Sequence, residues 1–315
     1  MRILFCGDCF PASHSLLKER LRASEDEIAV CNGANLRESL SQADVVIPMM
    51  TILDEARMES GSFRLIQQWG SGLEGVDLAA ARARGIWVAN VPASGNNADS
   101  VAEHALLLTL ALLRQLPAAQ ANVRAGILGA PLGRMLAGRT VCLCGLGATA
   151  LALSGRLRAL GARLLGISRH ASSAKAAAFA LSACYSTHHK ALCLAQTEIL
   201  VLCVRLNAQT RGLVDAGALA MLPKGAYLVN AARGALVEYD ALYDALSRGA
   251  LGGVALDVFW EEPVRTDDPL LLLPNVLATP HVAGVTEQSY AEIADAVATN
   301  IERLRRGEPI CNCAA

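Results

Sequence analysis

Three polar residues in the last third of the sequence have side chains suited to proton transfer and anion binding. They are Arg233, which precedes a glycine, Glu262, which precedes a proline, and His281, which follows one. A guanidinium group can hold a carboxylate through two parallel hydrogen bonds. A histidine paired with a carboxylate can give or take a proton near neutral pH. Together the three residues predict a site that binds and protonates a small acid.

A glycine-rich turn further upstream indicates a nucleotide. An apolar run ends at Gly145, and the sequence Gly145-Leu-Gly147-Ala148-Thr149 leads into a helix-like stretch. The first glycine permits a tight turn, and the second has no side chain to keep a pyrophosphate from the backbone. The amides of Ala148 and Thr149, at the helix N-terminus, would then meet the phosphates. We interpret this turn as a dinucleotide site, which together with the acid–base residues predicts redox chemistry on a small acid.

The end of the next expected strand bears on which dinucleotide is bound. A carboxylate at this place would hydrogen-bond the adenosine ribose and repel a 2′-phosphate. This sequence instead has a hydroxyl, Ser168, followed by a cation, Arg169. The pair favours NADP(H) as cofactor, with NAD(H) still possible. The other interpretation, that Arg169 is an ordinary surface arginine, stays open.

The bulk properties of the chain are those of a well-buried globular protein. Its 315 residues suffice for about two domains, and 53% of them are hydrophobic while 18% are charged. A net charge of −1 gives no electrostatic support for nucleic-acid binding. The longest apolar run, 105–113, is far shorter than the roughly 18–20 residues of a membrane span. Without a signal peptide or zinc-type cysteine spacing, we expect a cytoplasmic protein with no metal site.

Short apolar runs alternate with helix-like stretches along the whole chain, an order that predicts two doubly wound parallel sheets in an α/β fold. A turn-rich break at 92–99 separates the two series. Ser100 and Glu103 then have the spacing of a capping box for a helix over 101–113. An amphipathic helix is expected over 287–306. Strands are expected at 3–6, 28–31, 45–47, 65–69 and 87–91, and then at 141–144, 163–167, 199–204, 226–229, 253–255 and 276–278.

With these residues identified, the sequence resembles the D-isomer-specific 2-hydroxyacid dehydrogenases over nearly its full length. The resemblance implies a Rossmann NAD(P)-binding domain, residues 98–284. That domain would be inserted into a flavodoxin-like substrate domain made of residues 1–97 and 285–315. The stretches that carry the resemblance are 68–77, 100–104, 145–147, 222–234, 255–259, 262–263 and 280–281.

The resemblance also implies catalytic roles for the three polar residues. Arg233 would bind the substrate's carboxylate and carbonyl oxygen, and His281 would be the acid–base group. Glu262 would orient and charge that histidine. Glu262 is preferred to the adjacent Glu261 because Pro263 follows it, as in the family.

Further positions are implied to contact substrate or cofactor. Backbone amides of the loop Gly70-Ser71-Gly72 would hold the substrate carboxylate. Asp257 would lie near the nicotinamide carboxamide. Two more residues implied to contact the cofactor are Val204 and Ala232.

The sequence departs from the family pattern in two places. Ala148-Thr149 stands where members often have an arginine or asparagine followed by isoleucine, so one side-chain contact to the phosphates is missing. Arg205 stands where a proline is usual, beside the expected cofactor. Arg205 is either a second contact to phosphate or substrate, or a solvated loop charge.

The resulting hypothesis is NAD(P)H-dependent reduction of a small 2-oxo acid, such as glyoxylate or hydroxypyruvate, to the D-2-hydroxy acid. The alternative is a dinucleotide-sensing scaffold of the corepressor type with the same fold. We also expect a homodimer in which the helix 101–113 and the segment 117–136 cross between subunits. His104 is expected to lie on a helix face near the hinge between the domains.

Overall fold

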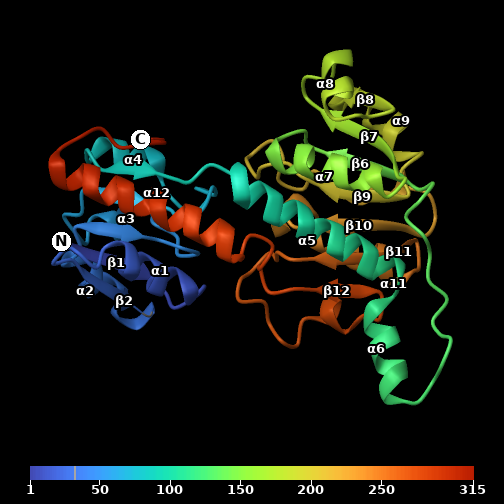
Figure 1. Cartoon of the computed structure of the whole chain (residues 1–315), viewed down its shortest axis with the longest axis horizontal. Helices are drawn as coiled ribbons and strands as arrows, with labels where there is room; N and C mark the ends of the chain where they lie inside the picture. Colours follow the sequence, from blue (N-terminus) through green and yellow to red (C-terminus); the bar gives the residue numbers. More distant parts are fainter. Residues whose placement is uncertain (32) are drawn as a thin grey trace. The chain divides into compact units, whose positions relative to one another are not determined.

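The computed structural model describes residues 1–31 and 33–315, and the chain divides into two compact units. Unit 1 comprises Met1–Asn97 and Thr286–Ala315, and unit 2 comprises Ala98–Val285. Each unit has its own parallel sheet with helices packed against it (Figure 1). The expected fold class, two doubly wound parallel-sheet domains, is confirmed.

Unit 1 contains a five-stranded sheet in the order β2-β1-β3-β4-β5. This is the strand order of flavodoxin-like folds. Its strands are β1 (Arg2–Cys6), β2 (Glu27–Cys31), β3 (Val45–Ile47), β4 (Leu65–Gln67) and β5 (Trp87–Ala89). Its helices are α1 (Ala12–Arg20), α2 (Leu36–Ser41), α3 (Glu55–Met58), α4 (Leu78–Ala83) and α12 (Glu287–Arg306).

The central strand β1 is buried on both faces. Leu4 and Cys6 pack in a cluster with Leu40 of α2 and Met58 of α3. On the other face, the ring of Phe5 meets His14 of α1, with 4.4 Å between the ring centroids. A parallel strand covered on both faces needs a continuous apolar run. This requirement explains why the start of the sequence is apolar at successive positions.

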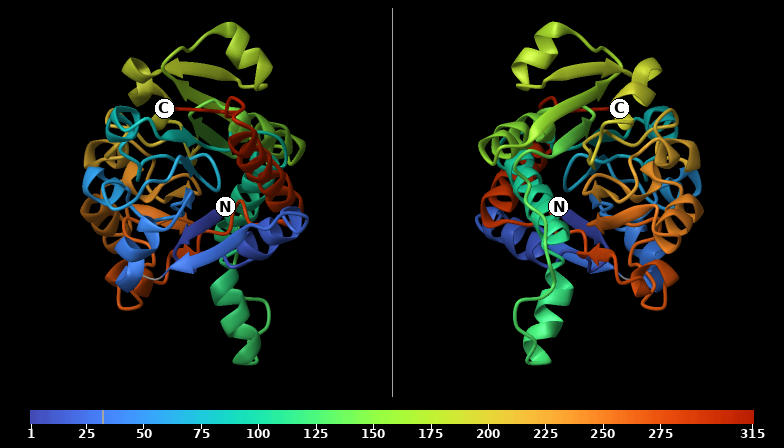
Figure 2. Two further views of the ribbon diagram at one scale, coloured as in Figure 1. Left: turned by 90° about the vertical axis from the view of Figure 1, so that its left-hand side faces the viewer. Right: turned by 90° about the vertical axis from the view of Figure 1, so that its right-hand side faces the viewer.

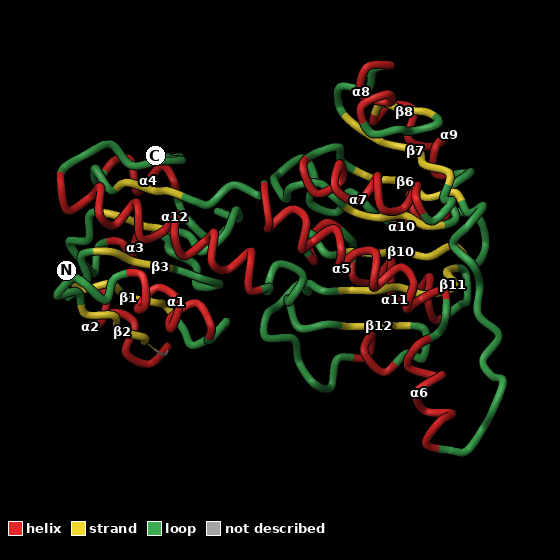
Figure 3. The backbone as a smooth tube through the Cα atoms, viewed as in Figure 1, coloured by secondary structure: helices red, strands yellow, loops and turns green. Residues whose placement is uncertain are grey.

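Unit 2 contains a seven-stranded sheet in the order β12-β11-β10-β9-β6-β7-β8, and Figure 3 shows these strands side by side. The direction of strand addition reverses between β6 and β9, as in dinucleotide-binding folds. Its strands are β6 (Thr140–Cys144), β7 (Arg163–Ser168), β8 (Ala183–Ser186), β9 (Ile199–Leu202), β10 (Ala226–Asn230), β11 (Leu251–Leu256) and β12 (Val276–Ala278). Its helices are α5 (Gly95–Leu113), which begins just before the boundary, α6 (Leu116–Arg124), α7 (Ala148–Ala159), α8 (Ser173–Ala178), α9 (Lys190–Leu194), α10 (Ala216–Ala220) and α11 (Tyr239–Ser247).

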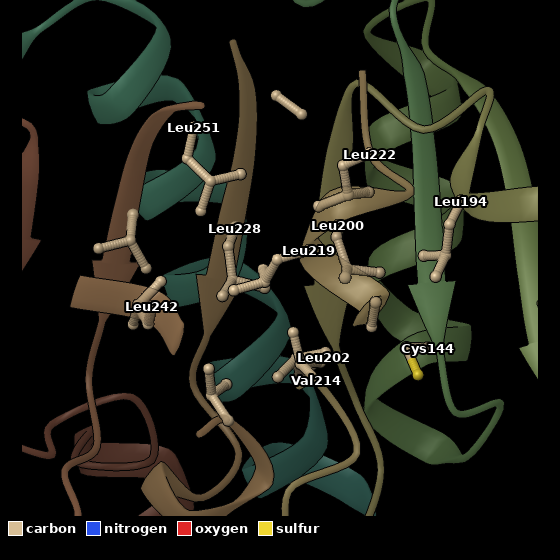
Figure 4. Packing of buried hydrophobic residues seen from close by; sticks show 14 of the residues in the cluster. Cys144, Leu194, Leu200, Leu202, Val214, Leu219, Leu222, Leu228, Leu242 and Leu251 are labelled. Atoms are coloured by element: carbon tan, nitrogen blue, oxygen red, sulfur yellow. The ribbon is translucent and has the colours of Figure 1, made fainter. Parts of the chain in front are cut away.

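The two faces of this sheet pack against different helices. Val141 and Leu143 of β6 belong to a buried cluster that includes residues of α5 and α7. The alternate residues of the same strand, Cys142 and Cys144, belong to a second cluster with residues of α9, α10 and α11. Figure 4 shows part of this second cluster, which contains Leu228 of β10. The sheet edge that carries the functional loops is therefore fixed from both sides.

The start of helix α5 corrects one expectation. The helix begins at Gly95, so Ser100 lies inside it and the expected capping box with Glu103 is wrong. Near the helix start, the Asn96 amide donates instead to Glu292 Oε2 of α12 at 2.9 Å. A carboxylate from another helix thus satisfies a donor that the helix itself leaves unpaired. This partner is distant in the sequence, so the local pattern did not reveal it.

Two further features of unit 2 are an edge strand that the sequence did not predict and a helix that extends from the sheet. Among the described strands, β8 pairs with β7 alone and forms the edge of the sheet. Its four residues are half-buried and do not form a continuous apolar run, which is why the sequence did not predict this strand. Helix α6 extends away from the sheet of unit 2, and the chain after it runs back toward the end of α5 (Figure 2). Among the described residues, no helix combines the length and the apolar composition that a membrane span requires.

Candidate active site

The candidate site residues of unit 2 follow three neighbouring strands. Asn230, Leu256 and Ala278, the last residues of β10, β11 and β12, are paired at the same level of the sheet. Arg233 follows the first of these strands and His281 follows the third. Because parallel strands end at one edge, the loops that carry these residues gather at the carboxyl edge of the sheet, where such folds bind ligands.

The structure brings Glu262 and His281 together. Glu262 Oε2 lies 2.6 Å from His281 Nδ1, and Glu262 Oε1 accepts a hydrogen bond of 2.8 Å from the amide of Phe259. The neighbouring Glu261 is exposed. With an ionised Glu262 as acceptor, Nδ1 carries a proton. The carboxylate therefore fixes the orientation of the imidazole, and Nε2 is the ring nitrogen that can exchange a proton with a substrate.

The backbone around His281 is held by a second, buried carboxylate. Asp257 is fully buried. Its Oδ1 accepts from the Val282 amide at 2.9 Å and from the Thr279 hydroxyl at 2.6 Å. Its Oδ2 accepts from the Ala283 amide at 2.8 Å. Asp257 thus ties the residues on both sides of His281 to the end of β11.

These contacts stabilise an uncommon backbone conformation. His281 has φ +54°, in the left-handed region that costs a non-glycine residue roughly 1–2 kcal/mol. Its amide donates to the Thr279 carbonyl at 3.0 Å. Burial acts to raise the pKa of Asp257, but hydrogen bonds from His104, Thr279 and the two amides outweigh it, and the pKa lies below its ordinary value. The fold therefore keeps this carboxyl ionised.

Arg233 is positioned by the buried amide side chain of Asn230. Asn230 Nδ2 donates to the Arg233 carbonyl at 2.8 Å, and Oδ1 accepts from the Ala232 amide at 3.1 Å. A Cβ added to Gly234 would lie 2.1 Å from the carbonyl carbon of Phe259. The arginine loop is thus packed against the loop that carries Glu262, and only glycine fits at that contact.

The turn after β6 fits a dinucleotide. Gly145 has φ +96°, and an added Cβ would lie 2.8 Å from the Val204 nitrogen, so glycine is required there. Above Gly147 the position of a Cβ meets nothing within 4 Å, which leaves the backbone approachable. Helix α7 begins at Ala148 without a side-chain cap, so its first amides, including that of Thr149, are available to phosphate oxygens.

The adenosine end of such a ligand would lie near the end of β7. Ser168 ends this strand, and its hydroxyl accepts from Lys175 Nζ at 3.1 Å. Arg169 is exposed and donates to Gln209 Oε1 at 3.3 Å. Arg169 follows β7 and Gln209 lies in the loop after β9, while the glycine turn follows β6. Because β6 lies between β7 and β9 in the sheet, the contact between Arg169 and Gln209 passes over the glycine turn. One cation, Lys175, therefore contacts the Ser168 hydroxyl. A second, Arg169, bonds to the loop after β9.

The other expected cofactor positions lie on nearby loops. Val204 and Arg205 follow β9, and the side chain of Arg205 is exposed. The Arg205 carbonyl accepts from the Thr210 hydroxyl at 2.8 Å, which shapes this loop. Ala232 is half-buried beside Arg233. Asp257 directs its two oxygens to protein donors, as described above, so its bonds in this structure serve the His281 segment.

In unit 1, the Gly70-Ser71-Gly72 loop follows β4. Its carbonyls are all bonded: Gly70 to the Val91 amide at 2.8 Å, Ser71 to the Asn90 side chain at 2.9 Å, and Gly72 to Gln68 Nε2 at 2.9 Å. Within residues 1–31 and 33–315, the amides of Ser71 and Gly72 donate to no partner. Such consecutive amides form a concavity suited to a carboxylate.

Sequence reasoning gave Asn230, Thr279 and Lys175 no role at these sites, and it expected His104 only as a helix-face residue near the domain hinge. Asn230 carried a usable signal, because a polar residue at the end of a buried strand must find partners. Thr279 and His104 act through contacts between segments distant in the sequence. Lys175 lies nearer, on the helix that follows Ser168. Among the described residues, no group of three or more metal-ligating side chains is arranged to hold an ion.

The fold and the glycine turn define a dinucleotide-binding protein, and comparison with known proteins identifies its family. The model of the "D-isomer specific 2-hydroxyacid dehydrogenase, NAD binding domain" matches residues 106–283. The chain therefore belongs to the D-isomer-specific 2-hydroxyacid dehydrogenase family. The class of cofactor is a nicotinamide dinucleotide.

Individual relatives cover the chain to different extents. The D-3-phosphoglycerate dehydrogenase of Archaeoglobus fulgidus is 31% identical over 300 residues, which are 93% of this chain and 56% of that protein. The glyoxylate reductase of Korarchaeum cryptofilum is 31% identical over 281 residues, 86% of this chain and 82% of that protein. The crystal structure of TT0316 protein from Thermus thermophilus is 30% identical, with a TM-score of 0.87 over 100% of both chains. The chain thus spans about half the length of the phosphoglycerate dehydrogenases it matches.

We predict that Asp257→Asn destabilises unit 2 in a pH-dependent way. The amide replaces one acceptor by a donor that faces another donor, an unsatisfied contact that costs about 1–3 kcal/mol. Because the pKa of Asp257 is lowered, its stabilising contribution is complete above the ordinary carboxyl pKa and is lost as the pH falls through the folded-state pKa. Urea unfolding of the wild type and the variant at pH 7 and at pH 3 measures the difference between their free energies of unfolding. This difference should be larger at pH 7, and an equal difference at the two pH values would contradict the prediction.

Proposed function

We propose that this protein reduces a small 2-oxo acid to the D-2-hydroxy acid, with His281 as the acid–base group. The observation that carries the proposal is the 2.6 Å contact between His281 Nδ1 and Glu262 Oε2 at the carboxyl edge of the sheet. An imidazole held by a carboxylate in this way is suited to proton transfer near neutral pH. Membership in a dehydrogenase family supports a reaction in which this proton transfer accompanies transfer of a hydride.

The glycine turn at 145–147 and the first amides of α7 would hold a reduced nicotinamide dinucleotide, which would supply a hydride to the keto carbon. Protonated His281 gives the proton on Nε2 to the carbonyl oxygen as negative charge develops there, so the carbon gains a hydride and the oxygen gains a proton. Glu262 stabilises the imidazolium before the transfer and keeps Nδ1 protonated after it. Arg233 holds the substrate carboxylate and polarises the carbonyl, a pairing that a planar guanidinium favours.

We also propose that the loop Gly70-Ser71-Gly72 of unit 1 binds a substrate carboxylate. The amides of Ser71 and Gly72 are suited to an anion of this kind. A small 2-oxo acid is proposed because the relative named glyoxylate reductase is 31% identical over 86% of this chain. We therefore place glyoxylate and hydroxypyruvate first among the acids to test.

NADPH is proposed as the preferred cofactor. Ser168 and Arg169 leave no carboxylate to repel a 2′-phosphate, and Lys175 adds a second cation at 3.1 Å from the Ser168 hydroxyl. An arginine or lysine contact to a phosphate is a charge-assisted hydrogen bond. Arg205, which is exposed on the loop after β9, is proposed as a solvated charge rather than as a ligand.

A homodimer is also proposed. Helix α6 and the chain that returns from it to the end of α5 carry Val123, Leu128, Leu132 and Met135, which are 79%, 95%, 92% and 72% exposed. Exposed apolar side chains concentrated in one segment of the chain mark an interaction surface. Helix α5, which precedes this segment, is apolar on most of its faces. A second copy of the chain would bury these side chains.

We expect His281→Ala to lower turnover about 10²–10⁴-fold, the usual contribution of general acid catalysis. The assay follows loss of reduced-nicotinamide absorbance with glyoxylate, hydroxypyruvate and pyruvate. His188→Ala, at an exposed histidine, is the matched control. Near-wild-type turnover of the His281 variant would disprove the role. Binding of the cofactor without turnover of any acid by the wild type would favour a dinucleotide-sensing scaffold.

We expect Arg169→Ala to weaken NADPH binding about tenfold to a hundredfold while NADH binding changes little. This follows from roughly 1.5–3 kcal/mol for a charge-assisted hydrogen bond. Lys175→Ala should act in the same direction, and Ser168→Asp should shift the preference toward NADH. Fluorescence titration with both cofactors measures these changes. Equal losses for NADPH and NADH in Arg169→Ala would show that the arginine does not read the 2′-phosphate.

Light scattering at micromolar concentration should give twice the 33.1 kDa mass of one chain. The double variant Leu128→Asp, Leu132→Asp should give the mass of one chain, because burial of two carboxylates in an apolar contact is costly. Leu272→Asp, at a leucine that is 74% exposed outside this segment, is the control and should stay dimeric. A wild-type mass of one chain would refute the dimer.

A further inference from the structure

His104 of α5 lies against the segment that carries His281, although the reaction proposed above makes no use of it. His104 Nε2 is 3.0 Å from the Thr279 hydroxyl oxygen and 3.4 Å from Asp257 Oδ1. The side chain of His104 is 13% exposed. A second histidine–carboxylate contact thus lies beneath the loop of the first one, on the same unit.

The proton positions in this contact follow from counting donors. Thr279 has a single hydroxyl proton, and it is donated to Asp257 Oδ1 at 2.6 Å. The same oxygen can then only accept from His104, so Nε2 must carry a proton. The hydrogen bonds therefore run in one direction, from His104 through Thr279 to Asp257. This assignment holds for both the neutral and the protonated ring.

The two residues that His104 contacts also frame His281. The Thr279 carbonyl accepts the His281 amide at 3.0 Å. Asp257 accepts the amides of Val282 and Ala283, at 2.9 and 2.8 Å. The left-handed backbone of His281 is thus fixed on its N-terminal side by Thr279 and on its C-terminal side by Asp257. The side chain of Thr279 links the two supports, and His104 is the donor that orients it.

We propose that His104 is a positioning residue for His281, acting through Thr279 and Asp257 on the backbone that presents the imidazole. Glu262 acts on the ring itself, so the two histidine contacts have separate tasks. This inference rests on the proposed function of His281. It assigns His104 no contact with substrate or cofactor. If His104 only filled space in the interior, a leucine would replace it without effect on His281.

The first experiment compares His104→Leu with His104→Gln in the reductase assay. Loss of the donor should lower kcat about fivefold, within the range that one neutral hydrogen bond spans. The dissociation constant of the cofactor should stay unchanged. A glutamine can place an amide N–H near the position of Nε2, so His104→Gln should recover most of kcat. His188→Leu makes the same substitution at an exposed histidine and should match the wild type.

A second experiment reads the position of His281 without requiring turnover. Diethyl pyrocarbonate acylates accessible imidazoles, and peptide mass spectrometry gives the rate at His281 alone. This rate should rise at least twofold in His104→Leu and return toward the wild-type value in His104→Gln. Thr279→Val removes the linking hydroxyl at nearly constant volume and should behave like His104→Leu. It provides the same test if the leucine variant does not fold.

The outcomes separate the inference from the proposed function. Faster acylation of His281 in His104→Leu and in Thr279→Val supports the positioning role, whether or not the wild type reduces a 2-oxo acid. If the wild type reduces none, only the proposed function is overturned. Unchanged kcat and unchanged acylation in a folded His104→Leu or Thr279→Val would overturn the positioning role. A drop in kcat that glutamine does not recover, with unchanged acylation of His281, would also overturn it.

Discussion

A carboxylate that is fully buried must be satisfied by donors, and the loop that carries His281 is arranged around this requirement of Asp257. Three donors from the chain beyond β12 converge on its two oxygens. The hydrogen bonds from these donors to Asp257 hold the backbone in a turn, and within this turn His281 has a left-handed conformation. The need to pair one charge therefore determines where the imidazole is presented.

The parallel sheet makes this arrangement possible. Its strands end at one edge, so loops that are distant in the sequence become neighbours there. Close packing then joins the loops to one another. Gly234 lies so near the backbone of Phe259 that a methyl group would not fit. The loops of Arg233 and Glu262 consequently have one relative position, which a site for a planar carboxylate needs.

The charged side chains at this edge of the sheet have different kinds of partner near β10 to β12 and near β7. Near β10 to β12 the anionic groups Asp257 and Glu262 are paired with donors and an imidazole. Near β7 the cations Arg169 and Lys175 contact neutral oxygens of Gln209 and Ser168. Neutral partners leave these cations able to exchange their bonds for a phosphate. The proposed preference for NADPH rests on this difference between the two ends of the edge.

The sequence by itself determined the two sheets, the glycine turn and the choice of Arg233, Glu262 and His281 as candidates. Apolar runs of strand length, glycines that a turn requires and residues that follow strand ends are local signals. Only the tertiary structure decided where α5 begins, that β8 forms the sheet edge and that His104 contacts the segment that carries His281. His104 and Thr279 are 175 residues apart, and no local pattern encodes a hydrogen bond over that separation. Such partners are selected by the need to satisfy buried polar groups once the sheet has formed.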